Sequence, residues 1–511
     1  LTEFGVKVLS TFQKIYALRF TILTLKLFPC VYFSAEHLAE LVVSIGAADI
    51  GGEMMGSSKR TSVVPSSGEA VKTTAEAFPS NKRKKAVIAL CARLLPDDMM
   101  LEVLLRLPVK SILRFQAVCR SWAALFSSKD FCSLHMATSK VPPQAPKLLV
   151  VSPTAELDST TVCSYSPSGS SSRNALLFTV DSARRNSMEV VMPSPCCGLT
   201  LLFDAVAPAY YVCNASTREV TRLPPHSLPK YDSSAGLGFD ARTREYKVVR
   251  LINGLSDEKE TIRCDVYTPG ADRWRPAAGG VPFKWSLFAN SAVAHAMVNK
   301  IPPVFVNGFL HWLINPSLFF RRPRAAIISF SVAEETFGCV QSPPFWGPEE
   351  HLRSWSQSER EHLVVMDDQL CIVRDLRNRT PDGSTLEIWG LLDYGSGDWS
   401  LKHRIDLFGQ VRTELGEPKV VRVIGSVGNS TLGKKIVIAT SERWVHEKFQ
   451  KKVYTYDPRC QVLEAILSVT ETHPRLTRLI PGSRFSLFEE SLTPVHKTDD
   501  ELAMPYTLAK L

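Results

Sequence analysis

The spacing of apolar residues changes once along this chain, and the change separates two kinds of structure. Near residue 100, apolar residues recur at i, i+3, i+4 and i+7, the spacing of one face of an α-helix; they are Met100, Val103, Leu104 and Leu107. Pro108 ends this helix, and the pattern predicts a second short helix over 109–115 and a third from Cys119 onward. Three short helices cannot bury all of their apolar faces by themselves, so this motif needs a partner surface.

Beyond residue 176 the apolar period becomes two, the period of β-strands separated by turn residues. The segment Asn214–Glu219 recurs 26 residues later as Asp240–Glu245, and an Asn or Asp that opens a turn accepts hydrogen bonds from the turn backbone. Asn307-Gly308 indicates another turn, and so does Asp367-Asp368, for which a pair of acid–base carboxylates is the less favoured interpretation. Hairpins repeated over about 300 residues favour a kelch-like β-propeller of about six to eight blades.

The predicted fold class is therefore α+β multidomain, with a small three-helix motif followed by a large all-β domain. A composition of 45% hydrophobic and 22% charged residues excludes a chain that is disordered throughout. The predicted boundaries are a disordered or non-native leader over 1–90, the helical motif over 91–138, a Pro/Ser-rich linker over 139–175, the β-propeller-like domain over 176–495 and a tail over 496–511.

A net charge of +9 would suit a nucleic-acid or membrane partner. The distribution of the charged residues along the chain does not support this. Residues 141–511 are nearly balanced, with 42 Lys and Arg against 40 Asp and Glu, so the excess lies in the first part of the chain. A nucleic-acid-binding domain concentrates positive charge on one face. An apolar stretch over 15–35 is interrupted by Arg19 and Lys26, which leaves runs too short to span a bilayer. We therefore expect no nucleic-acid partner and no membrane partner.

The 12 cysteines are scattered, without C-x-x-C or zinc-finger spacing. This distribution is typical of core thiols in a reducing compartment, and we expect no metal and no cofactor.

The leader raises a question about the start of the chain. Met54 and Met55 precede a polar, Ser- and Lys-rich stretch, so we hypothesise that one of them is the initiator and that residues 1–53 come from an over-extended gene model. Peptides from residues 1–53 in the native protein would contradict this. The basic run over 81–85 is either a nuclear-import signal or a solvated segment, and we expect a location in the nucleus, the cytoplasm or both.

The helical motif, LP-DD-x4-VLLRLPVKSILRF-x2-VCRSW-x2-L-x5-F over 95–131, closely resembles the F-box of plant F-box proteins. An F-box docks on a Skp-family adaptor, which joins a cullin in an SCF-type ubiquitin ligase, so the resemblance implies a non-catalytic subunit of that ligase. The residues that match core or adaptor-contact positions of the family are Leu95, Pro96, Leu107, Pro108, Leu113, Val118, Cys119 and Trp122. For any one of them, Trp122 especially, packing among the helices is an equally good explanation.

The β segments resemble the F-box-associated domain that follows many plant F-boxes. The matching segments are Asn214-x-x-Thr217-Arg218-Glu219, Gly238-Phe239-Asp240 with Glu245–Val249, Asn307-Gly308-x-x-His311-Trp312, Leu401–Ile405 and Glu490–Leu492. One departure is Cys197, which precedes Gly198-Leu199 where family members usually have an Asn, and a cysteine there weakens a turn.

The resemblance implies a substrate receptor whose F-box binds the adaptor and whose β domain binds an unknown target protein. Arg and Trp side chains suit protein recognition, and the candidates are Arg321, Arg322, Arg324, Trp346 and Trp355. The alternative is a propeller that binds glycans or glycoproteins independently of ubiquitination. An enzymatic propeller is the third possibility, but the sequence lacks a nucleophile or metal constellation. The G-x-G-x-x-A run at 236–241 precedes a β-like segment rather than the helix of a dinucleotide site.

Overall fold

The structure is a computed structural model, and the part of the chain that it describes lies within residues 101–496. The gaps are at 103, 118–119, 139–146, 155–158, 167–172, 182–187, 205–206, 226–232, 257–258, 283–288, 295, 297–300, 315–324, 346–360, 378–384, 417–419, 429–432, 442–447 and 473–484. No helix among the described residues combines the length and the apolar character needed to cross a membrane.

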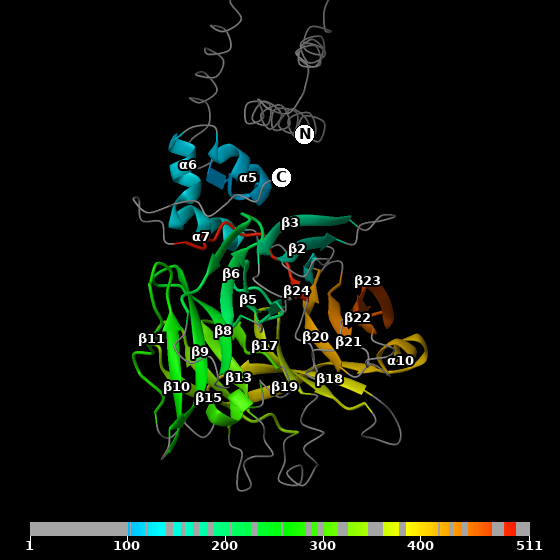
Figure 1. Ribbon diagram of the computed structural model, residues 1–511. Helices are drawn as coiled ribbons and strands as arrows, with labels where there is room; N and C mark the ends of the chain where they lie inside the picture. The colour runs from blue at the N-terminus through cyan, green and yellow to red at the C-terminus, as the bar shows by residue number, and fades with distance from the viewer. Residues whose placement is uncertain are drawn as a thin grey trace, which may run out of the picture. The chain divides into compact units, whose positions relative to one another are not determined.

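The helical motif contains α5 (Val109–Gln116), α6 (Arg120–Ser127) and α7 (Lys129–Thr138) (Figure 1). Helix α5 buries Val109, Ile112 and Phe115, the i, i+3, i+6 face that the sequence predicts. An aromatic series joins the three helices edge to face: the ring centroids of Phe115 and Trp122 lie 5.6 Å apart, those of Trp122 and Phe126 5.7 Å apart, and those of Phe126 and Phe131 5.0 Å apart. Trp122 therefore does pack the motif together.

Six antiparallel sheets of four strands follow, and we call them blades A to F. Blade A contains β24 (Phe485–Leu487), β1 (Leu148–Pro153), β2 (Ser159–Ser166) and β3 (Arg173–Asp181); blade B contains β4 (Met188–Val190), β5 (Leu199–Asp204), β6 (Ala209–Asn214) and β7 (Glu219–Arg222); blade C contains β8 (Ser233–Asp240), β9 (Glu245–Ser256), β10 (Lys259–Tyr267) and β11 (Arg275–Pro276). Blade D contains β12 (Val304–Val306), β13 (Phe309–Leu313), β14 (Ala325–Ser331) and β15 (Phe337–Gln341); blade E contains β16 (His362–Met366), β17 (Gln369–Asp375), β18 (Thr385–Asp393) and β19 (Asp398–Asp406); blade F contains β20 (Val420–Val427), β21 (Lys435–Ser441), β22 (Lys448–Asp457) and β23 (Val462–Thr472).

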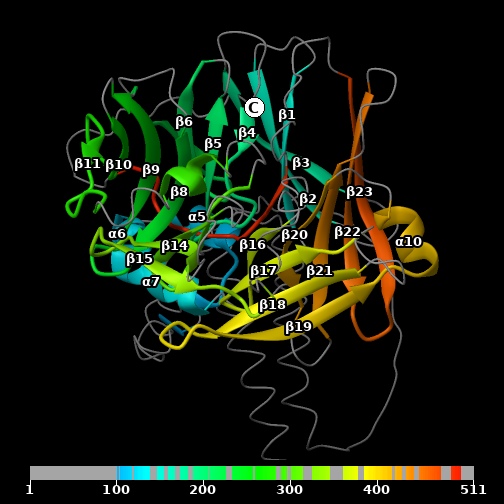
Figure 2. The ribbon, with the colours of Figure 1, turned by 90° about the horizontal axis from the view of Figure 1, so that it is seen from below.

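The blades form a closed β-propeller, in which each blade contacts the next through its first strands (Figure 2). The ring closes in blade A, where the C-terminal strand β24 pairs antiparallel with β1 in the register Leu148↔Leu487 and Val150↔Phe485. The predicted propeller is confirmed, with six blades. A short helix, α10 (Gly409–Leu415), lies in the connection from blade E to blade F and buries Val411 and Leu415.

The propeller begins earlier than the sequence predicts, because β1 and β2 lie within the segment 139–175 that was expected to be a linker. The serines and threonines of β2 suggested a loop, yet Thr160, Val162 and Tyr165 are buried. Thr is β-branched and suits a strand, so a Ser/Thr-rich composition does not exclude one.

One turn geometry recurs in five of the blades. It opens at Asn214, Asp240, Ser331, Asp393 and Asp457, and the residue four positions later has a positive φ in each case: Arg218, Arg244, Glu335, Gly397 and Gln461. In three of these turns the backbone N–H of the later residue donates to the carbonyl of the first residue at 2.8–3.0 Å; the pairs are Arg244 with Asp240, Glu335 with Ser331, and Gly397 with Asp393. The predicted similarity of Asn214–Glu219 and Asp240–Glu245 is thus a shared turn, although the first lies in the outer hairpin of its blade and the second in the inner hairpin.

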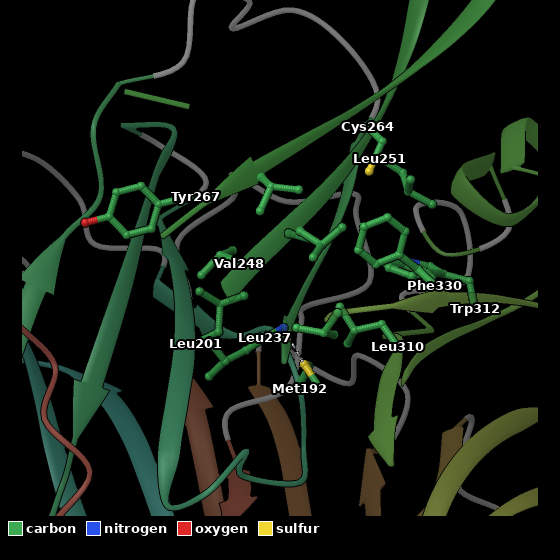
Figure 3. Close-up of a cluster of buried hydrophobic side chains, with 14 of the residues drawn as sticks. Met192, Leu201, Leu237, Val248, Leu251, Cys264, Tyr267, Leu310, Trp312 and Phe330 are labelled. Carbon is green, nitrogen blue, oxygen red and sulfur yellow. Dashed lines mark hydrogen bonds between the residues drawn. The ribbon is translucent and has the colours of Figure 1, made fainter. Parts of the chain in front are cut away.

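The largest core cluster lies between blades B, C and D (Figure 3). Trp312 is fully buried, and its Nε1–H donates to the hydroxyl of Ser234 at 3.1 Å. Met192 Sδ accepts the backbone N–H of Leu237 at 3.0 Å, the contact that is dashed in Figure 3. Gly236 has a packing role, because a Cβ there would lie 2.8 Å from the Leu310 side chain. The run at 236–241 is therefore strand and turn, not a dinucleotide site.

Candidate docking surfaces

The predicted adaptor-binding residues within the described part of the chain lie on the rim of the helical motif. Pro108 is exposed at the N-terminus of α5, while Leu107, Leu113 and Trp122 are half-buried. His135 Nε2 lies 2.9 Å from the carbonyl oxygen of Leu107, which fixes the backbone where the first predicted helix meets α5. Apolar surface that is left partly uncovered on a folded motif suits a partner helix or groove.

The other predicted site residues lie outside the described residues. These are Leu95, Pro96, Val118 and Cys119 of the helical motif, and Arg321, Arg322, Arg324, Trp346 and Trp355 of the β domain. Their roles stay predictions.

A C-terminal segment, residues 488–495, crosses the turns of blades B and C, and we call it the C-terminal strap. The side-chain amide of Asn214 donates to the carbonyls of Ser491 at 3.0 Å and Thr493 at 2.8 Å. Tyr246 donates its hydroxyl to the carbonyl of Val495 at 2.8 Å, and Thr493 Oγ1 donates to the carbonyl of Cys197 at 3.0 Å. The strap therefore follows the closing strand β24 directly and fastens two neighbouring blades.

Gly198 explains why the strap can lie so close to blade B. It has a φ of +75°, and a Cβ on it would lie 2.1 Å from Ser491 Cβ. Its neighbour Cys197 also has a positive φ, +52°, in a tight turn closed by hydrogen bonds between Cys196 and Leu199. Asn adopts positive φ more readily than other non-glycine residues, which accounts physically for the Asn that the family usually places at this position.

The helical motif contacts the propeller and the strap through α7. Lys129 Nζ lies 2.9 Å from Glu245 Oε1, and Asp130 forms an ion pair with Arg244, so two oppositely oriented pairs link α7 to the β8–β9 turn. Cys132 Sγ lies 3.5 Å from the carbonyl oxygen of Leu492 in the strap, and burial raises the pKa of this thiol to about 11. Each exposed ion pair contributes little stability. Together with the buried contact of Cys132, the ion pairs show which face of α7 lies against the propeller and the strap.

A buried ionic network joins blade C to the next blade. Lys247 Nζ lies 3.1 Å from Asp240 Oδ2 and 3.1 Å from Glu335 Oε1, and Arg275 forms two hydrogen bonds with Glu335. Burial alone would raise the pKa of Glu335, yet the hydrogen bonds from Arg275, Ala278 N–H and Lys247 lower it to about 2. The carboxylate of Glu335 therefore stays ionised at neutral pH and joins blade C to blade D.

Among the described residues, no group of three or more His, Cys, Asp or Glu side chains comes together in a way that could hold a metal ion. Asp367 and Asp368 form the tight turn between β16 and β17 with φ of +57° and +56°, as the sequence predicts. His311 is a buried residue of β13.

Comparison with known proteins agrees with this architecture. The model of the F-box associated beta propeller domain matches residues 155–412, and the F-box domain model matches residues 93–134. An F-box protein of Arabidopsis thaliana is 27% identical over 61% of this chain and 79% of its own length. An F-box/kelch-repeat protein of the same plant is 27% identical over 49% of this chain and 65% of its own length. The chain belongs to the family of F-box proteins with an F-box associated beta-propeller domain.

Sequence reasoning missed the contacts between α7, the β8–β9 turn and the strap. Glu490–Leu492 was identified as a family segment without a role, and the structure supplies one, since Ser491 and Leu492 lie in the strap. The sequence does contain a signal for these contacts. Lys129-Asp130 and Arg244-Glu245 each place a positive residue directly before a negative one, so the two dipeptides can form two ion pairs when they meet in opposite directions.

Proposed function

We propose that this protein is the substrate-receptor subunit of an SCF-type ubiquitin ligase. The helical motif binds a Skp-family adaptor and through it a cullin, and the propeller binds a target protein in the nucleus, the cytoplasm or both. The observation that carries the proposal is an F-box with a partly uncovered apolar rim, followed in the same chain by a closed propeller.

The proposed mechanism is one of proximity rather than catalysis. A bound target and a ubiquitin-loaded conjugating enzyme that belong to one complex meet at a high effective concentration. This chain contributes the geometry: α7 is held against the β8–β9 turn and the strap, and its contacts limit how far the adaptor-binding rim can move relative to the propeller.

Co-purification with a Skp-family adaptor and a cullin tests the proposal. The variant Leu107→Asp with Pro108→Ala places a charge and removes a ring at the rim, so we expect recovery of the adaptor to fall by at least about tenfold. Because Leu107 is half-buried, a second variant, Lys110→Glu with Arg114→Glu, changes only exposed positions of α5 and should weaken binding without unfolding the motif.

Leu176→Asp is the matched control, since Leu176 is 57% exposed on β3 of the propeller. It introduces the same charge outside the helical motif and should leave adaptor recovery unchanged. The proposal is wrong if the wild-type chain recovers no Skp-family adaptor, or if neither rim variant reduces recovery while each retains the wild-type melting temperature.

A further inference from the structure

Three aromatic rings gather where blade D meets blade E. Phe309 and His311 lie two residues apart on β13, and Tyr394 lies in the β18–β19 turn. The ring centroid of Tyr394 is 5.7 Å from that of His311 and 6.5 Å from that of Phe309, and the centroids of Phe309 and His311 are 6.3 Å apart. Phe309 and Tyr394 are each 38% exposed, whereas His311 is completely buried beside them. The rings therefore form a small aromatic surface with a histidine as its base.

The histidine adds no positive charge to this surface. Burial lowers the pKa of the imidazole to about 4, although hydrogen bonds with the backbone of Val304 and Phe309 oppose the shift. The base is thus neutral at physiological pH.

Two aspartates belong to the same turn as Tyr394. Asp393 and Asp398 flank Tyr394 in the same turn and are exposed; Asp393 accepts the backbone N–H of Ser396 and Asp398 accepts the Ser396 hydroxyl, both at 2.7 Å. Asp367 and Asp368 lie in the neighbouring β16–β17 turn, which Gln369 ties to blade E's outer hairpin through a hydrogen bond to the carbonyl of Leu391. Lys434 pairs with Asp367 at 2.7 Å. Four carboxylates therefore lie in two adjoining turns of one blade.

We propose that this aromatic–acidic surface, formed by Phe309, His311, Tyr394, Asp393 and Asp398, binds an Arg or Lys side chain of the target protein beside an apolar residue. A cation is attracted to the faces of aromatic rings, and a carboxylate adds a charge-assisted hydrogen bond. The inference rests on the proposed receptor function, and it specifies the chemistry of the target segment. Charge complementarity favours a basic peptide over a neutral or acidic glycan.

The test uses the full chain in complex with its adaptor, on an array of heptapeptides that differ only at two central positions. We expect peptides with Arg-Phe or Lys-Leu at the centre to be retained at least about tenfold more than peptides with Glu-Phe or Ser-Ser, and the difference to shrink as salt is raised. Phe309→Ala with Tyr394→Ala should abolish the selection. Asp393→Asn with Asp398→Asn should reduce it severalfold, because Asn at 393 still accepts the Ser396 N–H while the charge is lost.

Two matched controls keep the result specific. Leu176→Ala removes an exposed apolar side chain from blade A, and Asp457→Asn removes a charge from the equivalent turn of blade F; both should retain the selection. The inference is overturned if the array shows no preference for basic peptides, if the Phe309/Tyr394 variant keeps the preference, or if a glycan array is bound through these residues instead. Recovery of the adaptor is measured on the same samples. Normal recovery with no selection contradicts the aromatic–acidic surface alone, whereas loss of recovery in the wild type contradicts the proposed function.

Discussion

Glu335 of blade D and Arg275 of blade C are joined by two parallel hydrogen bonds, from Nη1 to Oε2 at 2.7 Å and from Nη2 to Oε1 at 2.6 Å. Lys247 approaches the same carboxylate from β9. The carboxylate is thus shared by two cations of the neighbouring blade, and the boundary between blades C and D depends on its charge.

Replacing Glu335 with Gln should destabilise the propeller by about 2–3 kcal/mol, because Arg275 then loses its buried counter-ion and Lys247 keeps only Asp240. The cost should depend on pH. Since the pKa of Glu335 is lowered from 4.5 to about 2 in the folded state, its stabilisation is present above pH 4.5 and is lost as the pH falls toward 2. Chemical unfolding of wild type and variant between pH 7 and pH 3 measures this, and the difference should narrow at the acidic end.

The neighbouring Glu334 provides the control for that experiment. It pairs with Arg242 at 2.7 Å but is 64% exposed, so Glu334→Gln should cost less than about 1 kcal/mol. Equal losses for the two glutamates would show that burial of the Glu335 network contributes nothing.

Cys197→Asn should raise stability by about 0.5–1 kcal/mol, because Asn adopts the positive φ of this position at a lower cost than Cys. Cys197→Ala keeps the same backbone strain and should give no gain. Melting temperatures measured under reducing conditions separate the two variants. If Ala stabilises as much as Asn, the thiol rather than the backbone is responsible.

Asn214→Asp should loosen the strap while preserving its turn. The Asp side chain still accepts the backbone N–H of Ser216, but it cannot donate to the carbonyls of Ser491 and Thr493. We expect a loss of about 2–3 kcal/mol, since two buried acceptors lose their donor and face a carboxylate. Limited proteolysis should show faster cleavage near the strap. Asp457→Asn, in the equivalent turn of blade F, should change stability by less than about 0.5 kcal/mol.

A chain that stops after residue 484 lacks β24 and the strap, which leaves blade A with an unpaired β1 edge. Such an edge promotes aggregation, so we expect loss of the cooperative thermal transition and poor recovery of monomer on size-exclusion chromatography. A chain that stops after His496 retains both features and should behave as the full chain does. A cooperative transition in the shorter chain would mean that ring closure is dispensable.

The parts of this fold that could be predicted from the sequence are those that depend on near neighbours. The helix face of α5 and the turns at Asn214 and Asp367 each arise from a few consecutive residues. The number of blades could not be predicted, because the same turn occurs in the outer hairpin of blade B and the inner hairpin of blade C, and its spacing does not measure a blade. The strap depends on contacts such as Asn214 with Ser491, which are 277 residues apart.

The two candidate surfaces also differ in how far the sequence could predict them. The proposed adaptor-binding rim comes from a compact motif of consecutive residues, and Pro108, Leu113 and Trp122 are accessible or half-buried on it. The aromatic–acidic surface was not predicted, because Phe309 and Tyr394 come from different blades and no sequence motif contains both. Only the ring of blades brings them within 6.5 Å.

The pairing of β24 with β1 also means that the propeller can close only late in synthesis. The two strands begin at residues 485 and 148, so at about 5–20 residues per second the ribosome needs roughly 20–70 s to supply the partner of β1. During that interval the helical motif is already complete while the propeller is still open. Under the proposed function, a nascent chain can therefore meet the adaptor before it is able to hold a target, and a stop between the helical motif and β24 yields a molecule that occupies the ligase without delivering a substrate.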